Sequence, residues 1–333
     1  MMKISNICNN ISFIIQGVIL PDINDQIASI KKHFPDSKII VSTCNNFDFE
    51  VIGADKVIVS DDPGFFYYSD RPGEKKNNIN RQIVSTLAGL KACTTEYAFK
   101  IRSDFILNGN DFLKYFNTFS LSDSCYRIFG HKVLSCCYFA RNPRSNMPFP
   151  FHPSDIAFFG KVDDLINLFD IPLMTEKEAF WDTTNKRFNR YVPEQHLLIK
   201  CLEKNNRDIK CNHYNDVSQY NIEETERYFA SNFIFLTFEQ FNLVPTKSTF
   251  FVEDHPDSFL SCYTHVGWMK LYKEYVDHQI NVPEFDEEKA RIKKLYKKYK
   301  KYRFISNICA LPFRNKAKRR DIRNKILEYF LNK

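Results

Sequence analysis

Residues 77–104 read NNINRQIVSTLAGLKACTTEYAFKIRSD, and this stretch decides the fold. Within it, Asn80–Ala92 carries apolar residues three or four positions apart, which is the spacing of an amphipathic helix. Glu96–Arg102 follows as an apolar strand that ends at the polar pair Ser103-Asp104. A helix followed by a short turn and a buried strand is the repeating unit of an α/β protein.

The same alternation precedes this stretch. Asp25–Phe34 reads as a helix, and three apolar, β-branched runs around it read as strands: Ile11–Gln16, Lys38–Thr43 and Asp55–Ser60. Strands separated by helices predict an α/β fold with a mostly parallel, Rossmann-like sheet flanked by helices. Ligands bind such sheets at the carboxyl ends of the strands. We expect that rim to hold Gln16, Gly17, Thr43, Ser60, Asp61, Ser103 and Asp104.

Residues 126–200 are predicted to complete the same domain. The expected strands are Tyr126–Phe129, Val133–Tyr138 and Ile156–Gly160, and the expected helices are Asp163–Phe169 and Glu194–Asn205. Residues 206–280 give no clear pattern, and helical spacing returns from Glu284. We therefore predict an α/β domain over residues 1–283 and a basic helical extension over residues 284–333.

Two features of the central stretch point to a phosphate-bearing ligand. Asp104 ends its strand where a carboxylate suits Mg²⁺ or Mn²⁺, which often keep one or two protein carboxylates when a diphosphate supplies further oxygens. The alternative is an aspartate that caps the next turn. Asn80 and Arg81 open a helix, where backbone N–H groups and a guanidinium suit a diphosphate. The chain has neither G-x-G-x-x-G nor G-x-x-x-x-G-K-[ST], so neither a dinucleotide fold nor a P-loop is indicated.

Several runs together resemble a known family, the WavE lipopolysaccharide synthesis family. They are SFIIQGVI, FPDSKIIVST, GADKVIVSDDPG, NNINRQIVSTLAGLKA, KIRSDFIL, ARNPR and PFHPSDIAFFGKVDDL. The resemblance covers residues 11–200, with weaker similarity up to residue 275. It implies a GT-A-like fold and a glycosyltransferase that moves a sugar from a nucleotide-sugar to lipopolysaccharide, capsule or a related surface glycan.

The resemblance also implies roles for the donor side of a site. Many GT-A enzymes bind a divalent metal ion through a D-x-D motif, but Arg102 stands at the first position here, which leaves Asp104 alone. We expect Asp104 to hold Mn²⁺ or Mg²⁺ and Arg81 and Arg102 to neutralise phosphate. The remaining donor-side residues are expected to border the nucleotide: Gln16, Gly17, Thr43, Asn80 and Ser103.

The resemblance implies acceptor-side roles for Asp155 and Glu194. It also implies a metal-binding role for His265. Asp155 would orient the acceptor hydroxyl, or else cap a turn. Glu194 would be the general base, or else only a negative charge favoured by its helix start. His265 would complete the metal shell, or else pack beside Trp268 as a structural residue.

The end of the chain carries most of the positive charge. From Lys289 onward there are 17 Lys and Arg against two acids, a net charge of +15, which leaves −8 for the first 288 residues. The run ARIKKLYKKYKKYRF interleaves these cations with apolar and aromatic residues. Such a segment suits the anionic surface of a membrane, with packing on the main domain and nucleic-acid binding as the alternatives.

The sequence also bears on location and on rival functions. The first residues read as a strand start and not as a signal peptide, no stretch of 18 apolar residues occurs, and the ten cysteines show no C-x-x-C spacing. We expect a cytoplasmic protein, peripheral on the inner face of a bacterial plasma membrane. A sugar nucleotidyltransferase is one alternative, although Gln16-Gly17 lacks the expected Gly-rich loop. A non-catalytic protein that binds membranes or nucleic acid is the other.

Overall fold

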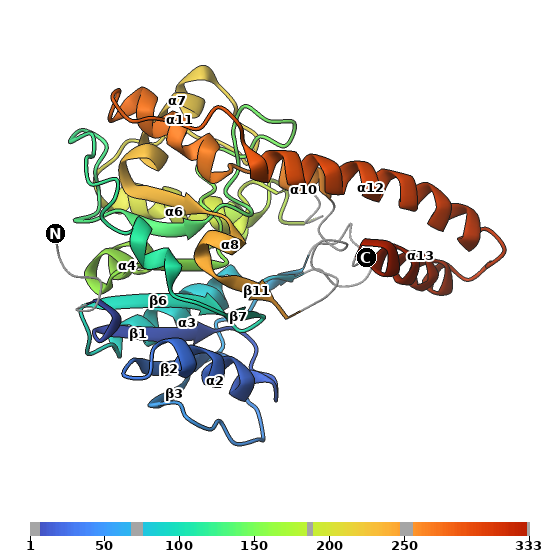
Figure 1. Ribbon diagram of the computed structural model, residues 1–333, viewed down its shortest axis with the longest axis horizontal. Coiled ribbons are helices and arrows are strands. Elements are labelled where there is room, and N and C mark those ends of the chain that lie inside the picture. Colours follow the sequence, from blue (N-terminus) through green and yellow to red (C-terminus); the bar gives the residue numbers. More distant parts are fainter. Residues whose placement is uncertain (1–6, 68–75, 185–188, 247–255, 332–333) are drawn as a thin grey trace.

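A seven-stranded sheet forms the centre of the molecule (Figure 1). The computed structural model describes residues 7–67, 76–184, 189–246 and 256–331. The strand order across the sheet is β10-β8-β9-β6-β1-β2-β3. Their bounds are β1 (Ile11–Gln16), β2 (Lys38–Thr43), β3 (Lys56–Val59), β6 (Tyr97–Arg102), β8 (Val133–Cys136), β9 (Ala157–Lys161) and β10 (Phe233–Leu236).

The sheet is mostly parallel, as the alternation of strands and helices predicted. β1 pairs in parallel with β2 and β6, β2 with β3, and β8 with β10. β9 is the exception, because it runs antiparallel to both of its neighbours, β6 and β8. The amino end of β9 therefore lies at the same edge of the sheet as the carboxyl end of β6.

Helices flank the sheet. Along the chain they include α2 (Ile23–His33), α3 (Ile79–Lys91), α4 (Val162–Phe169) and the short α5 (Glu176–Ala179). The others in the body are η1 (Asp111–Tyr115), α6 (Pro193–Lys204), α7 (Gln219–Asn232), α8 (Phe238–Phe241), α10 (Pro256–Leu260) and α11 (His265–Tyr275). The predicted helices at 25–34, 80–92, 163–169 and 194–205 are confirmed to within two residues at each end.

Successive residues of β1 pack on opposite faces of the sheet. The Phe13 ring lies 4.9 Å from the ring of Phe34, which ends α2. Ile14 instead faces α3, where a Cβ added to Gly89 would lie 2.5 Å from its Cγ2. Because both faces are covered, the strand is mostly apolar and all six of its residues are buried.

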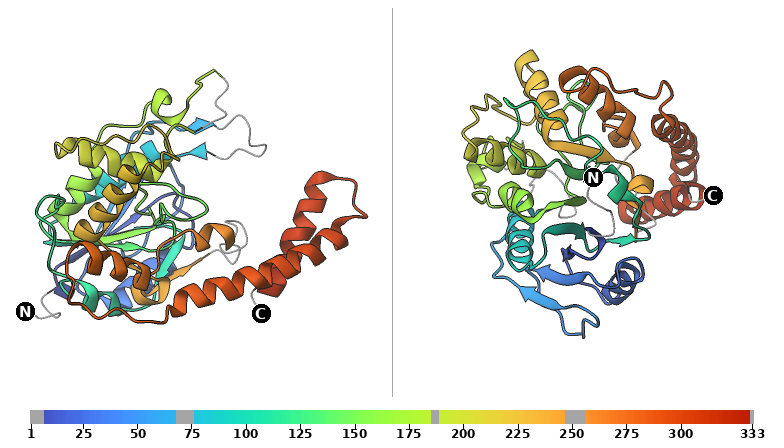
Figure 2. Two further views of the ribbon diagram at one scale, coloured as in Figure 1. Left: turned by 90° about the horizontal axis from the view of Figure 1, so that it is seen from above. Right: turned by 60° about the vertical axis from the view of Figure 1, so that its left-hand side comes forward.

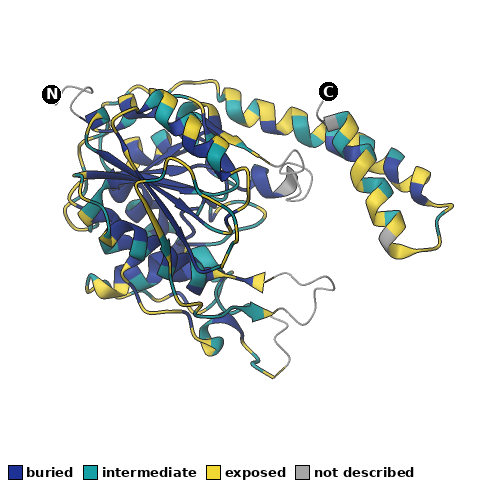
Figure 3. Cartoon of the chain, turned by 90° about the horizontal axis from the view of Figure 1, so that it is seen from below, coloured by how far each residue is buried: buried dark blue, intermediate teal, exposed yellow. Residues whose placement is uncertain are grey.

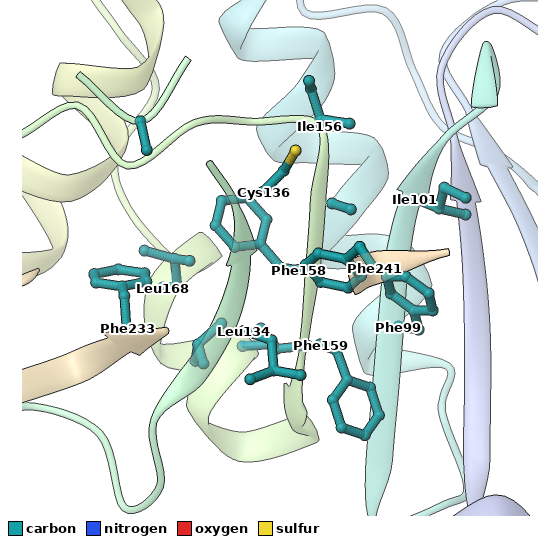
Figure 4. Packing of buried hydrophobic residues seen from close by; sticks show 14 of the residues in the cluster. Phe99, Ile101, Leu134, Cys136, Ile156, Phe158, Phe159, Leu168, Phe233 and Phe241 are labelled. Atoms are coloured by element: carbon teal, nitrogen blue, oxygen red, sulfur yellow. The ribbon is translucent and has the colours of Figure 1, made fainter. Parts of the chain in front are cut away.

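The same alternation holds in β9. Phe158 packs on Phe169 of α4 with ring centres 5.6 Å apart, whereas Phe159 packs on Phe112 of η1 at 5.1 Å. Figure 4 shows Phe158 and Phe159 within the cluster of buried side chains that β6, β8, β9 and β10 build between them. This continuous core fixes the strands whose ends form the site.

Two small antiparallel sheets border the main one. β4 (Phe66–Tyr67) pairs with β5 (Lys76–Asn77), immediately before α3. β7 (Phe105–Leu107) pairs with β11 (Leu243–Pro245) and follows β6 after a tight turn.

The strand predicted at Tyr126–Phe129 is wrong. The segment is irregular, because the backbone N–H groups of Ile128 and Phe129 donate to the side-chain oxygen of Asn232 instead of to a neighbouring strand. The buried Phe129 explains the apolar run, since it packs on Phe233 of β10. A short segment rich in aromatic and branched residues can therefore be a packed loop as well as a strand.

The chain ends in a pair of helices that projects from the body, α12 (Glu287–Ala310) and α13 (Lys316–Leu331) (Figures 1 and 2). The start of α12 is held to the body, since Thr264 donates to Asp286 and Tyr138 donates to Glu288. α13 folds back along α12, where the rings of Tyr302 and Phe330 stack with centres 4.1 Å apart. Among the described helices, none combines the length and the apolar character needed to cross a membrane. The domain boundary at residue 283 stays a prediction.

Candidate functional site

A cavity of about 800 Å³ opens at the carboxyl edge of the sheet. Its wall combines the ends of β1, β2 and β6 with the first turns of α3 and α6. The lining residues are Gln16, Gly17, Val18, Leu20, Asp22, Cys44, Asn45, Lys76, Asn78, Ile79, Arg81, Gln82, Ser85, Arg102, Ser103, Asp104, Asp155, Pro193, Glu194 and Thr246. Cavities of this size hold small-molecule ligands and cofactors.

The topology explains why residues distant in sequence meet here. Gln16 and Arg102 are the last residues of two paired parallel strands and face each other in register. Asp155 lies just before the antiparallel strand β9, so it reaches the same edge from the opposite chain direction. The predicted rim therefore exists as a cavity wall for Gln16, Gly17, Ser103 and Asp104, whereas Ser60 and Asp61 do not line it.

Gly17 lets the ends of β1 and β6 approach each other. Its φ is +138°, and a Cβ there would lie 2.6 Å from the Ser103 hydroxyl oxygen. The Ser103 hydroxyl donates to the Val18 carbonyl at 2.7 Å, and its N–H donates to the Gln16 carbonyl at 2.9 Å. A side chain at residue 17 would disturb these bonds and require a strained backbone.

Arg81 lies on the first turn of α3 and is held in a fixed orientation. Its Nε donates to Asp62 Oδ1 at 2.7 Å, and its guanidinium lies over the Phe65 ring with 4.5 Å to the ring centre. The hydrogen bonds from Arg81 lower the pKa of the Asp62 carboxyl to about 2. Its Nη1 donates to Asn78 Oδ1 at 3.2 Å, so the guanidinium is fixed beside the N–H groups that open α3.

Arg102 occupies the middle of the site between two carboxylates. Its Nε and Nη2 donate to the two oxygens of Asp104 at 2.9 and 2.7 Å, and its Nη1 lies 3.5 Å from Asp155 Oδ2. Burial alone would lower the pKa of the Arg102 guanidinium, but these two carboxylates raise it above its usual range. The guanidinium is therefore permanently charged, and Nη1 is its most loosely held nitrogen.

Lys100 lies beneath Asp155 and is fully buried. Its ammonium donates to the main-chain carbonyl of Asp155. Burial lowers the pKa of the Lys100 ammonium to about 8, although the nearby Asp155 carboxylate opposes this shift. A buried lysine of lowered pKa below a cavity floor is typical of a functional site, although structural networks produce the same shift.

Glu194 forms an ion pair with His152 on another wall of the cavity. Glu194 Oε2 lies 3.1 Å from His152 Nε2, and both side chains are largely buried, with 18% and 5% of their surface exposed. Burial favours the neutral carboxyl, but the pair with His152 prevails and lowers the pKa of Glu194 below its usual range. Glu194 is therefore ionised at neutral pH.

The loop that carries His152 and Asp155 has a strained backbone. Phe151 and Ser154 have φ values of +56° and +77°, a region that residues with side chains rarely adopt. Ser154 is held by a bond from its hydroxyl to the Tyr138 carbonyl at 2.6 Å, and Phe151 by a bond from its N–H to the hydroxyl of Thr225 at 3.1 Å. Such strain is concentrated at functional sites in proteins.

Two residues predicted for the donor side, Thr43 and Asn80, lie outside the cavity wall. Thr43 is fully buried, and its hydroxyl accepts from the N–H of Asn45, which does line the cavity. Asn80 exchanges two hydrogen bonds with the backbone of Met174, at 2.8 and 3.0 Å. Both residues therefore shape loops next to the site instead of facing a ligand in it.

His265 is not brought together with Asp104. It opens α11, and its Nδ1 bonds to the main-chain carbonyl of Phe235 at 2.8 Å. Its ring is buried and stacks on Trp268 at 5.8 Å between ring centres. The structural alternative for His265 fits these contacts, and it does not line the cavity.

The carboxylates of the site do not form a ready metal site. Within residues 7–67, 76–184, 189–246 and 256–331, no three His, Cys, Asp or Glu side chains gather as a metal would require. Both oxygens of Asp104 accept from Arg102, so a cation there would have to displace the guanidinium. Arg102 therefore supplies positive charge where the sequence predicts Mn²⁺ or Mg²⁺ at Asp104, and the metal role stays a prediction.

Sequence reasoning missed several members of the site. Asn45 and Lys76 line the cavity but lie outside the runs that carry the family resemblance, whereas Gln82 and Ser85 lie within the run NNINRQIVSTLAGLKA without having been assigned a role. The pairing of His152 with Glu194 was also missed, because it joins residues 42 positions apart. A signal did exist for His152, since HPSD was among the specific runs of the sequence.

The fold and the site define an α/β protein with a cavity of about 800 Å³ at the carboxyl edge of a mostly parallel sheet, lined by Arg81 at the start of α3 and by Glu194 at the start of α6. The chain belongs to the WavE lipopolysaccharide synthesis family, whose sequence model matches residues 11–303. The match includes every residue of the cavity wall. No curated protein is similar to the chain.

Proposed function

We propose that the protein is a glycosyltransferase that moves a sugar from a nucleotide-sugar to a lipopolysaccharide or related surface-glycan acceptor. One observation carries the proposal: a single cavity of about 800 Å³ combines Arg81, Arg102 and the start of α3 with the carboxylates Asp155 and Glu194. Cations at a helix start suit a diphosphate, and carboxylates suit sugar hydroxyl groups. The family description supports the glycan context.

The donor diphosphate would lie between Arg81 and Arg102. Arg81 points from a helix start whose N–H groups favour anions, and Asp62 and Phe65 hold its guanidinium in place. Arg102 offers Nη1, because Asp104 already occupies its other donors. Lys76 adds a third cation to the wall. These charges would stabilise the leaving nucleoside diphosphate without a metal ion.

The nucleoside would lie along the ends of β1 and β2. Gln16, Gly17 and Asn45 present polar groups there, and Gly17 leaves room for close approach of a ligand to the backbone. This placement follows the general rule that ligands of parallel α/β sheets bind outside the carboxyl ends of the strands. A GT-A-like donor half is consistent with it.

The acceptor would lie near Asp155 and Glu194. The acceptor hydroxyl oxygen attacks the anomeric carbon, the bond from that carbon to the diphosphate oxygen breaks, and the nucleoside diphosphate leaves with the electron pair. Glu194, which is ionised at neutral pH, would take the hydroxyl proton as the general base. Asp155, next to Arg102, orients the hydroxyl.

The test is a thermal-shift screen of the full chain with UDP-, GDP-, CMP- and dTDP-sugars, each with Mn²⁺ and with a chelator. Ligands that bind only the folded state raise the melting temperature. We expect one nucleotide class to stabilise the protein to the same extent in both conditions. Stabilisation by none of the four classes would remove the donor site from the account.

A further inference from the structure

One face of α12 is exposed along its length and changes character toward the tip of the helix pair. The middle turns of α12 carry lysines at 293, 297, 300 and 301. Phe304 and Ile308 follow in its last turns, and Leu311 caps the end of the helix. These positions are three, four or seven residues apart, so they share one face. We call this face, from Lys293 to Leu311, the outer stripe.

The apolar end of the outer stripe is unusually exposed. Phe304, Ile308 and Leu311 expose 69%, 51% and 66% of their surface. Figure 3 shows the helix pair as largely exposed, in contrast to the buried sheet. Burying these three side chains would be favourable, because each contributes in proportion to the apolar area removed from water.

The opposite face of α12 is the one that packs within the protein. Ile292, Tyr299, Ser306 and Ala310 are buried there, and Tyr299 belongs to a small core with Leu327 of α13. The helix pair is therefore held together by its inner side. The residues of the outer stripe lie outside this small core.

The part of the chain that matches the family ends before the exposed apolar residues of α12. The match to the family ends at residue 303, immediately before Phe304. The cavity lies entirely within the matched part, whereas Phe304, Ile308, Leu311 and α13 lie beyond it.

We propose that the outer stripe docks the protein on an anionic lipid bilayer, with Phe304, Ile308 and Leu311 inserted at the boundary between headgroups and acyl chains. A row of lysines followed by Phe, Ile and Leu on one face matches the two interactions that hold a helix at such a surface. The lysines attract anionic headgroups, and the apolar side chains leave water. Nucleic acid would use the lysines alone and leave the apolar tip exposed.

The surroundings of the tip are complementary to the same partner. Arg314, Lys316, Lys318 and Arg320 follow Leu311 in the turn and the start of α13, and all four are exposed. Positive charge therefore lies on both sides of the apolar group. Cations that flank an inserted apolar group in the sequence add to its attraction to an anionic leaflet.

The test is flotation of the full chain with vesicles of phosphatidylcholine alone and with 30% phosphatidylglycerol. We expect binding to the anionic vesicles only. The triple variant Phe304→Ser, Ile308→Ser, Leu311→Ser should lower the partition coefficient by about tenfold or more, since three exposed apolar groups no longer insert. The variant with Lys293, Lys297, Lys300 and Lys301 all changed to Glu should lower it by roughly 600-fold or more, at about fivefold for each of the four lost lysines.

A matched control separates the stripe from overall charge. Lys32, Lys56, Lys270 and Lys273 are also exposed and lie elsewhere on the body, so changing these four to Glu gives the same net charge. This control should lose much less vesicle binding than the stripe variant. Far-ultraviolet circular dichroism and the melting temperature of each variant check that the chain still folds.

Three results would overturn the proposal. The first is wild-type vesicle binding by the serine triple variant. The second is an equal loss in the control with four distant lysines changed. The third is self-association of the wild type that the serine variant abolishes while no vesicle binding occurs, which would make the tip an interface between copies of the chain. None of these readouts involves a nucleotide-sugar, so they are independent of the proposed transfer reaction.

Discussion

Replacing Arg102 by Met is the substitution that most sharply tests the donor site. The side chain has about the same length but no charge, so Asp104 and Asp155 lose the guanidinium that lies 2.7 to 3.5 Å from their oxygens. In the wild type this cation offsets one of the two carboxylates. In the variant both negative charges face the diphosphate, and one charge-assisted hydrogen bond to it is lost.

The size of the effect follows from that lost bond. A hydrogen bond to a charged group contributes about 1.5–3 kcal/mol. Each 1.4 kcal/mol is a factor of ten in the dissociation constant. We therefore expect Arg102→Met to weaken nucleotide-sugar binding by about 10- to 150-fold. Arg102→Lys should fall in between, because it keeps the charge and loses the planar fork.

Isothermal titration calorimetry with the nucleotide-sugar selected by thermal shift measures this change. Arg144→Met is the matched control, since Arg144 also makes a two-pronged ion pair, with Glu226 at 2.6 and 2.8 Å, but lies outside the cavity wall. This control should bind the donor as the wild type does, even if its melting temperature falls. Unchanged affinity in Arg102→Met, or an equal loss in Arg144→Met, would refute the role of Arg102.

Three further predictions concern other parts of the site and the core. Asp104→Asn should weaken donor binding only modestly, because Asp104 positions Arg102. The loss should be equal with Mn²⁺ and with chelator, and a loss seen only with Mn²⁺ would support a metal at Asp104. Glu194→Gln should lower kcat by about 10²- to 10⁴-fold with little change in donor affinity, as expected when a general base is lost. An unchanged kcat in a transfer assay would exclude that role. Burial lowers the pKa of Lys132 from 10.5 to about 7. The unfolded chain therefore binds more protons than the folded one above pH 7, and stability from this group rises with pH at about 1.4 kcal/mol per unit. Relative to Lys132→Met, the wild type should gain about 2–3 kcal/mol in urea unfolding between pH 7 and 9; parallel pH dependences would contradict this.

Local sequence patterns were enough to predict the main strands and their rim. Each of the runs at 11–16, 38–43 and 97–102 is mostly apolar and is closed by a polar pair or a glycine, so length and composition indicate a strand and its end. Parallel strands bring those ends to one edge. Gln16, Gly17, Ser103 and Asp104 could therefore be assigned to one site without knowledge of the structure.

The chemistry within the site depended on contacts that local patterns do not encode. Only the antiparallel direction of β9 explains how Asp155 reaches Arg102. The environment of Asp104 changed its interpretation, because a guanidinium occupies both of its oxygens. His265 lies near Trp268 in the sequence, and the two rings also stack in space. The bond from His265 to the carbonyl of Phe235 could not be predicted, because it depends on how α11 packs on β10.

The central claim is that a nucleotide-sugar binds at the carboxyl ends of β1, β2 and β6. Amide hydrogen exchange of the full chain, with and without a saturating concentration of the stabilising nucleotide-sugar, tests this claim most directly. The account predicts slower exchange in peptides that cover residues 16–22, 78–85 and 102–104, and no change in residues 287–331. No change around the cavity, or slowing confined to the helix pair, would contradict it.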